Sequence, residues 1–408
     1  MQVVVKKFGG TSVGNIEKIK RVANIISRSL KSGQKVVVVL SAMSGVTDSL
    51  IETIRKVSDL SSPATSFEYD SILSSGEQVS AGLLALALQS IGLKARSYLG
   101  WQLPIKTDGN FSSGNIVEIN TAPILQSLSI DEIPVICGFQ GVYEGRIVTL
   151  GRGGSDTTAA AIAAALNAER CYIYTDISGV YTSDPKIVEK ANQIEMIAYA
   201  EMLEMSMTGA KVLHPRAVEI AMRSNLKMQV LSTFDNTPGT ILVSDCNASS
   251  KNYITGIAGR SDIAVLMLPC ADIVGSLAQK IYKLFEYHSL YTEVLQLSAQ
   301  SLRAMNYLVF IVNKSEINKV QQVFASESQL RGMEYTLNTS VAKIAIVNTN
   351  TSKQDSILQK MFQILSEKGI NILATAISKV KVAVLVDDIH KELAMRSLHT
   401  AFGLDREE

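Results

Sequence analysis

The sequence lacks any marked excess of charge: 39 lysines and arginines face 38 aspartates and glutamates, a formal net charge of +1 over 408 residues. This balance excludes a broad basic surface for nucleic acid or an anionic membrane. Long apolar runs are also missing, because candidates such as Val36 to Leu40 and Gly82 to Leu88 fall far short of the about eighteen residues that a membrane span requires. The N-terminus has no apolar signal segment. We therefore expect a soluble, cytoplasmic protein that binds neither nucleic acid nor membrane.

Cysteine is scarce, and its few positions carry no pairing pattern. The four cysteines are Cys137, Cys171, Cys246 and Cys270, without any Cys-x-x-Cys spacing. Reduced core residues are the expected reading, and the four scattered histidines predict no metal site. No Gly-x-x-x-x-Gly-Lys-Ser/Thr loop occurs either, which excludes a P-loop nucleotide site.

The first 245 residues alternate between β-type and α-type patterns. Apolar runs at 2–8, 35–40, 133–137 and 171–174 predict buried strands, and helical patterns lie near 16–26, 46–59, 71–91 and 156–167. Strands that alternate with helices favour an α/β fold with a mainly parallel sheet covered on both faces. A polar stretch from Ser244 to Asn252 is the best candidate for a linker.

The rest of the chain contains two weakly similar α+β units. Each has a strand, a helix and further strands, at 264–268, 274–287 and 308–312 in the first and at 342–347, 354–368 and 380–386 in the second. The sequence therefore predicts one domain over 1–245 and two small modules over 253–334 and 335–408.

Two glycine-rich turns are candidates for phosphate and carboxylate binding. Lys7-Phe8-Gly9-Gly10-Thr11-Ser12 ends a predicted strand, where glycine amides and a lysine can approach an anion. Gly151 to Thr158 runs into an alanine-rich helix, and its Arg152 offers a two-pronged donor for a carboxylate. Simple turn geometry and helix capping are the alternative reading for both. A third stretch, Thr175 to Lys186, reads by itself as ordinary turn chemistry.

Taken together, these segments resemble the aspartate kinases of the amino-acid kinase family in order and spacing. Four further segments support the likeness, which covers residues 2 to about 243: Ser41-Ala42-Met43, Ser75-Gly76-Glu77, Gly138-Phe139-Gln140-Gly141, and Gly209 to Pro215. The resemblance implies a three-layer sandwich and an enzyme that transfers the γ-phosphate of ATP, with Mg²⁺, to the side-chain carboxylate of L-aspartate. This reaction would open lysine, threonine and methionine biosynthesis.

The resemblance also implies roles for individual residues. Lys7 would stabilise charge on the transferring phosphoryl group and Asp156 would orient the lysines. The aspartate-binding residues would be Ser41, Thr47, Glu77, Arg152 and Ser155. The ATP-binding residues would be Lys7, Gly9, Gly10, Ser12, Thr175, Asp176, Tyr181, Lys186 and Lys211. Lys186 stands where an arginine is common in the family, and His214 before Pro215 is expected to be structural.

The reaction is consistent with the absence of a candidate catalytic histidine. A carboxylate with a solution pKa of about 3.9 is already ionised at neutral pH, so this nucleophile needs no general base. The difficulty is to bring two anions together, which calls for cations and aligned dipoles.

The two C-terminal units resemble paired ACT domains, small ferredoxin-like modules that bind free amino acids at shared interfaces. The likeness is good at Lys368-Gly369-Ile370-Asn371-Ile372 and poorer in the first unit, where Ala271-Asp272-Ile273-Val274-Gly275 replaces the usual turn. It implies a homo-oligomer, a dimer through these modules, and lysine or threonine as an effector. A dimerisation platform without a ligand is the alternative.

There are two alternative functions. One is a relative acting on glutamate, carbamate or a nucleoside monophosphate, against which Ser75-Gly76-Glu77 and the segment Lys211 to Pro215 argue. The other is a sensor that has lost catalysis, but Lys7, Arg152 and Asp156 are retained. No dehydrogenase follows residue 408, so a fused two-enzyme form is not expected.

Overall fold

The computed structural model describes residues 2–58, 63–244, 253–270, 274–288, 290, 292–297, 306–328, 330–348 and 351–406. These residues fall into two compact units. The first contains 1–180, 193–206 and 211–247, and the second contains 181–192, 207–210 and 248–408. Residues 245–252 of the predicted linker Ser244 to Asn252 lie outside the described residues, and so do residues 271–273 of the segment Ala271 to Gly275.

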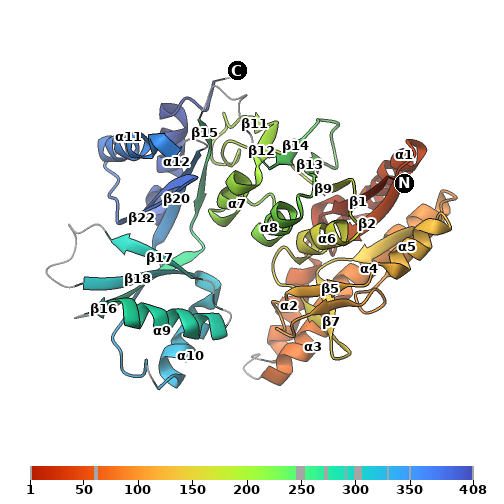
Figure 1. The fold of residues 1–408 in the computed structure, drawn as a ribbon, viewed down its shortest axis with the longest axis horizontal. Coiled ribbons are helices and arrows are strands. Elements are labelled where there is room, and N and C mark those ends of the chain that lie inside the picture. The colour runs from red at the N-terminus through yellow and green to blue at the C-terminus, as the bar shows by residue number, and fades with distance from the viewer. Residues whose placement is uncertain are drawn as a thin grey trace. The chain divides into compact units, whose positions relative to one another are not determined.

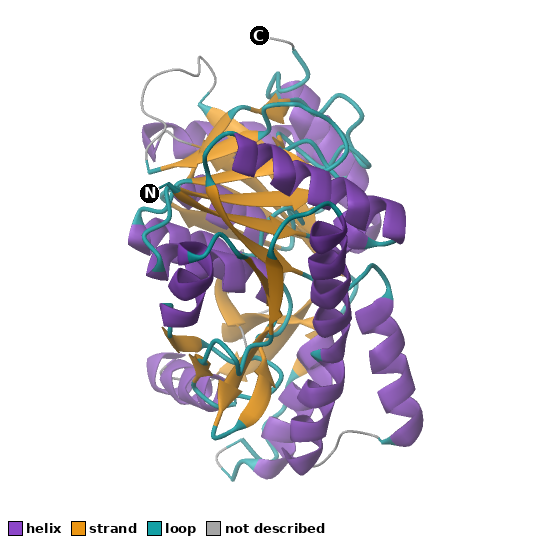
Figure 2. Ribbon diagram, turned by 90° about the vertical axis from the view of Figure 1, so that its right-hand side faces the viewer, coloured by secondary structure: helices purple, strands orange, loops and turns teal. Residues whose placement is uncertain are grey.

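The first unit is an α/β sandwich (Figures 1 and 2). Its helices are α1 (Ile16–Lys31), α2 (Val46–Val57), α3 (Pro63–Leu73), α4 (Ser75–Ser90), α5 (Ala122–Ser129), α6 (Gly154–Ala165), α7 (Tyr199–Met207) and α8 (Pro215–Ser224). Its main strands are β1 (Val3–Phe8), β2 (Lys35–Leu40), β3 (Ala95–Tyr98), β6 (Ile133–Cys137), β9 (Arg170–Thr175), β12 (Met196–Ala198), β13 (Met228–Ser232) and β14 (Thr240–Val243).

The sheet order is β12-β14-β13-β9-β1-β2-β6-β3 among the described residues. The strands from β13 to β3 are parallel, whereas β14 runs antiparallel to β13. The prediction of a mainly parallel sheet is therefore confirmed. A smaller sheet joins β4 (Ile105–Thr107), β5 (Ile116–Ile119), β7 (Gln140–Tyr143) and β8 (Arg146–Thr149), and β10 (Val180–Tyr181) pairs with β11 (Gln193–Ile194).

Alternating side chains of β1 serve the two faces of the sheet. Val4 and Phe8 pack in a core formed with α1 and α4, together with Ile19, Ile26 and Leu84. The helix α1 begins at Asn15, whose side chain accepts a hydrogen bond of 2.9 Å from the amide of Lys18. The opposite face of β1 lies against α6.

One helical run passes a length and composition test for a membrane span. It covers Thr65–Ser90, and half of its most apolar window is buried inside the structure. The helix α4 packs Leu84 and Leu88 against the strand core, which is the arrangement of a core helix.

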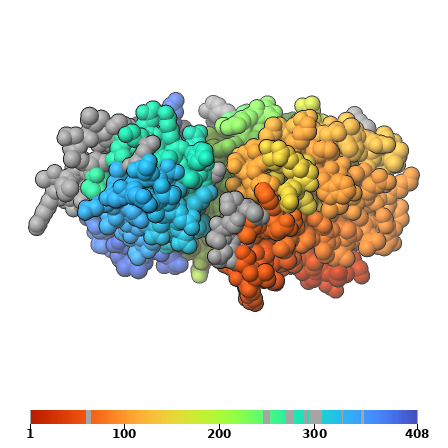
Figure 3. Space-filling view, turned by 90° about the horizontal axis from the view of Figure 1, so that it is seen from below, coloured from red at the N-terminus to blue at the C-terminus, as the bar shows by residue number. Residues whose placement is uncertain are grey.

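The second unit is built on a sheet of the order β15-β20-β22-β21-β17-β18-β16-β19 among the described residues. Its strands are β15 (Ile254–Arg260), β16 (Ile263–Cys270), β17 (Thr292–Leu297), β18 (Asn306–Asn313), β19 (Thr336–Asn338), β20 (Val341–Asn348), β21 (Ala374–Ser378) and β22 (Lys381–Asp387). Its helices are α9 (Val274–Tyr287), α10 (Ile317–Ser326), α11 (Gln354–Glu367) and α12 (Lys391–Ala401). In this unit, residues of the first half, from β16 to β19, lie next to residues of the second half, from β20 to α12, on the surface (Figure 3).

The structure differs from the predicted division of the chain at two places. The strand β15, predicted to open the module 253–334, pairs instead with β20, and Ile257 packs in the core of the following module. The segments 181–192 and 207–210, predicted to lie in the domain 1–245, pack with the second unit. Strand partners and packing partners are tertiary contacts that local periodicity does not encode.

Candidate active site

The carboxyl ends of neighbouring parallel strands bring the predicted loops together. The amide of Gly9 after β1 donates to the carbonyl of Tyr174 in β9 at 3.0 Å, and the amide of Gly138 after β6 donates to Leu40 in β2 at 2.9 Å. The amide of Ser41 donates to Phe8 at 3.2 Å. Parallel α/β sheets bind ligands at this edge, so the topology itself gathers the candidate residues.

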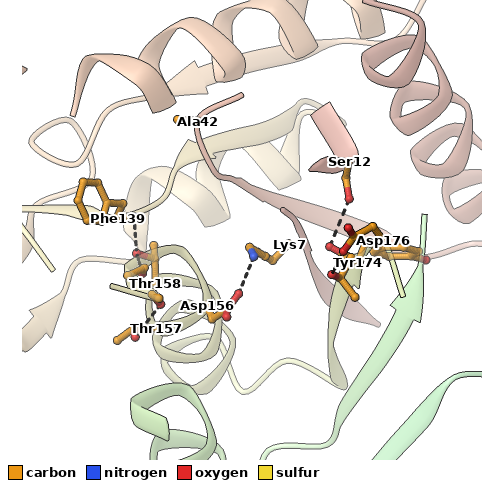
Figure 4. A network of polar contacts seen from close by, with 12 residues as sticks. Lys7, Ser12, Ala42, Phe139, Asp156, Thr157, Thr158, Tyr174 and Asp176 are labelled. Atoms are coloured by element: carbon orange, nitrogen blue, oxygen red, sulfur yellow. Dashed lines mark hydrogen bonds and ion pairs between the residues drawn. The ribbon is translucent and has the colours of Figure 1, made fainter. Parts of the chain in front are cut away.

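Lys7 and Asp156 form the central ion pair. The Nζ of Lys7 in β1 lies 2.6 Å from the Oδ1 of Asp156 in the first turn of α6, and both side chains are almost fully buried. Figure 4 shows the lysine side chain reaching from its strand toward Asp156. The structure thus joins two residues that lie 149 positions apart, which gives this edge a fixed, partly desolvated cation.

Glycine allows the turn that places Asp156. Gly153 has φ 66°, and a Cβ there would lie 2.2 Å from the side chain of His214. His214 in turn precedes Pro215, the first residue of α8, as the sequence predicted for a structural histidine. Burial lowers the pKa of this histidine. The close approach of the loop to α8 therefore requires glycine at 153.

The loop after β1 approaches the loop after β2 closely. A Cβ on Gly10 would lie 2.8 Å from the carbonyl of Ala42, and the amide of Ser44 donates to Gly10 at 3.1 Å. Ser12 is fully buried, and its hydroxyl shares a hydrogen bond of 2.6 Å with the hydroxyl of Thr233. The side chain of Ser12 therefore holds the loop, and its predicted contact with ATP stays a prediction.

Glu77 places a carboxylate in the interior beside this edge. Its Oε1 accepts a hydrogen bond of 2.9 Å from the amide of Ala42, and its side chain is 3% exposed. Oε2 is buried and has no hydrogen-bond partner among the described residues. Burial raises the pKa of Glu77 to about 7, although hydrogen bonds and the charge of Lys7 act in the opposite direction. An unpartnered buried carboxylate oxygen fits a ligand that brings its own cation.

The other predicted aspartate-binding residues lie near the same loops. Ser155 is buried in the first turn of α6. It lies so close to Gly138 that a Cβ added to this glycine would be 2.7 Å from the Oγ of Ser155. The carbonyl of Ser41 accepts a hydrogen bond of 2.7 Å from the hydroxyl of Ser80. Thr47 is half-buried in the first turn of α2, and Arg152 is exposed in the turn before α6.

The predicted ATP-binding residues are divided between the units. Thr175 is the last residue of β9 and Asp176 follows it, and the threonine hydroxyl donates to the Asp176 carboxylate at 3.1 Å. Lys211 is exposed in the first unit. Tyr181 and Lys186 belong to the second unit, and their predicted contact with ATP stays a prediction.

Arg216 is a residue that the sequence reading missed. Its guanidinium donates to the carbonyl of Leu150 at 2.6 Å, to that of Gly114 at 2.9 Å, and to the side chain of Asn115. It thereby ties the start of the glycine-rich turn to a neighbouring loop. Its position directly after Pro215 was the available signal.

Asp70 supports the same turn from the opposite side. Its Oδ2 accepts from the amides of Ser112 and Thr149, each at 2.8 Å, and its Oδ1 accepts from the hydroxyl of Thr149 at 2.7 Å. Asp70 is fully buried, and burial raises its pKa despite these bonds. No sequence pattern distinguished this aspartate from a surface residue.

Over the described ranges, no cluster of three His, Cys, Asp or Glu could hold a metal ion.

Comparison with known proteins places relatives along the whole chain. The Amino acid kinase family model matches residues 2–232, and an ACT domain model matches residues 344–402. An aspartokinase of Rickettsia felis is 38% identical over 99% of this chain and 100% of its own length. An aspartate kinase of Pseudomonas putida is 39% identical over 99% of this chain and 98% of its own.

Solved structures agree with these relatives. Aspartokinase III of E. coli in complex with aspartate and ADP has a TM-score of 0.83 at 25% identity, covering 98% of this chain and 99% of that one. The aspartate kinase of Clostridium acetobutylicum, described as an allosteric enzyme, has a TM-score of 0.70 at 25% identity, covering 98% and 100%.

The raised pKa of Glu77 predicts that its charge destabilises the fold. The folded state holds the proton up to about pH 7, whereas the unfolded chain releases it near the ordinary value of 4.5. Stability is therefore lost as pH rises between these values, by about 3 kcal/mol in all. Glu77→Gln should match the wild type near pH 4.5 and exceed it at pH 8 in urea unfolding. Glu17→Gln, on the exposed part of α1, is the control, and an equal gain at both pH values would contradict the prediction.

Arg216→Lys should slow turnover by about tenfold or more, because a lysine cannot hold three acceptors on two loops at once. The matched control is Arg223→Lys, at an exposed position in the last turn of the same helix. Steady-state kinetics with circular dichroism would check this. Unchanged turnover in a folded Arg216→Lys variant would show that the turn keeps its shape without the arginine.

Proposed function

The chain belongs to the aspartokinases of the amino acid kinase family, and from that premise we propose how its residues transfer the γ-phosphoryl group of ATP to the side-chain carboxylate of L-aspartate. It is a carboxyl-group phosphotransferase, and its product is 4-phospho-L-aspartate. The observation that carries the assignment of the centre is the buried Lys7–Asp156 pair at the strand ends. We place the enzyme in the cytoplasm, at the first step of lysine, threonine and methionine synthesis.

Charge compensation is the main task of this site. The aspartate carboxylate attacks the γ-phosphorus, the bond to the ADP oxygen breaks, and no proton has to be removed from the nucleophile. Lys7 stabilises the negative charge that develops on the transferring group. Asp156 holds the Lys7 ammonium in place at 2.6 Å.

Aspartate is held through its two charged ends. Its ammonium group pairs with the free Oε2 of Glu77, and the desolvated carboxylate becomes ionised when this cation arrives. Arg152 grips a carboxylate with its two-pronged donor. Ser41, Thr47 and Ser155 complete the aspartate site from the adjoining loops.

ATP is held mainly through its phosphates. The glycine turn of Gly9 and Gly10 allows close approach of the backbone, and Ser12 keeps that turn in shape. Thr175, Asp176, Tyr181, Lys186 and Lys211 are the further residues that we assign to the nucleotide. Mg²⁺ would enter with ATP and would supply positive charge that offsets the charge of the phosphates.

The C-terminal unit regulates the enzyme. Its second half matches an ACT domain, and its first half repeats the element order β-α-β-β-α-β over β16 to β19. We assign lysine or threonine as the effector and a homodimer through these modules as the assembly. An effector changes activity only if its affinity differs between two arrangements of the protein.

Incubation with ATP, Mg²⁺ and hydroxylamine should convert aspartate, but neither glutamate nor carbamate, to a trapped hydroxamate. Lys7→Ala should lower kcat by about 10² to 10³, since it removes a preorganised charge. Lys6→Ala is the matched control, because Lys6 is the neighbouring lysine and hydrogen-bonds instead to Tyr174. Turnover of glutamate with none of aspartate would overturn the assignment.

Titration of lysine and threonine, singly and together, should reveal end-product inhibition. Inhibition should be weak for either alone, because the first module departs from the usual turn at the start of α9. Activity and dimer content would be followed by coupled assay and by light scattering. No response to either amino acid would favour a module that serves only for dimerisation.

A further inference from the structure

The segment Tyr181–Asn192 joins predicted nucleotide contacts to the ACT-containing unit. It carries Tyr181 and Lys186, yet it packs with the second unit. Val188 is buried in the same apolar cluster as Leu398 and Phe402 of the last helix and the turn that follows it. The segment that contacts ATP is therefore anchored outside the first unit.

A single side-chain contact ties this segment to α12. The hydroxyl oxygen of Thr182 lies 2.9 Å from Nε2 of His399, within hydrogen-bond distance. The same oxygen accepts the amide of Asn192 at 3.0 Å. Thr182 thus closes the two ends of the segment on each other and holds both against the helix.

Backbone contacts fix the rest of the segment. The amide of Ile257 in β15 donates to the carbonyl of Thr182 at 2.7 Å, and the hydroxyl of Ser183 donates to the carbonyl of Ile257 at 2.9 Å. The side-chain amide of Asn192 donates to the carbonyls of Leu404 and Arg406 at 2.9 and 3.1 Å. The segment is therefore held by a strand, a helix and the turn after that helix.

His399 is placed for this contact alone. It is fully buried among apolar residues, and its Nδ1 has no hydrogen-bond partner among the described residues. Burial lowers its pKa, while the nearby Asp405 acts in the opposite direction. A neutral imidazole in an apolar cluster is costly unless it is hydrogen-bonded, and Thr182 supplies that bond.

We propose that His399 is a positioning residue for ATP, which sets the placement of the segment Tyr181–Asn192 through Thr182. His399 lies within the residues 344–402 that match an ACT domain. This inference rests on the proposed ATP-binding role of Tyr181 and Lys186.

The test compares His399→Leu with His399→Gln, whose amide nitrogen can stand in for Nε2. His399→Leu should raise the KM for ATP about fivefold to tenfold and leave the KM for aspartate within about twofold, the effect of losing one buried hydrogen bond. His399→Gln should restore most of the ATP affinity. His390→Leu, which alters the histidine just before α12, is the matched control.

Two further measurements separate this inference from a loss of folding and from the proposed function. Hydrogen exchange should quicken at the amides of Asn192 and Ile257 in His399→Leu, while amides of β20 and β22 stay protected. Thr182→Val should have the same effect, and the double variant should add little to either. Equal rises in both KM values, or faster exchange with an unchanged KM for ATP, would overturn the inference. An enzyme that binds ATP in this His399-dependent way but does not phosphorylate aspartate would overturn the proposed function alone.

Discussion

The ion pair between Lys7 and Asp156 is the contact around which the first unit is organised. A lysine on a central strand reaches the edge of the sheet as a fixed cation only if its neighbours hold the strand and a counter-charge holds the ammonium. Parallel pairing of β1 with β2 and β9 provides the first condition. The glycine turn before α6, tied down by Arg216 and Asp70, provides the second. Catalysis between two anions needs this rigidity more than it needs a proton acceptor.

The same edge carries a cost in stability. Glu77 and Asp70 are buried carboxyl groups, and burial raises the pKa of each. A purely structural core would fill such positions with apolar side chains. The apolar packing of α1 and α4 on the sheet offsets this cost in stability. The buried carboxyl groups then lie at the functional edge of the sheet.

The two units do not separate cleanly into one that carries all the predicted nucleotide-binding residues and one that only regulates. The second unit contains the segment from Tyr181 to Asn192, bound to β15 and α12. The contact between Thr182 and His399 joins the helix α12, within the residues that match an ACT domain, to the segment that we propose contacts the nucleotide. A short hydrogen-bonded link is well suited to two discrete arrangements, because the bond is either made or broken.

The sequence by itself determined the parallel α/β fold, the glycine turns and the identity of most candidate residues. The fold and the turns follow from apolar periodicity and from turn chemistry, which are local properties of the chain, whereas the candidate residues come from the resemblance to the aspartate kinases. Strand alternation places Lys6 and Lys7 on opposite faces of β1, but only packing shows which face holds Asp156. Tertiary structure alone decided that β15 pairs with β20, that Arg216 and Asp70 hold the turn, and that His399 meets Thr182. These contacts join residues far apart in the chain, and their energy depends on burial and geometry that no local pattern records.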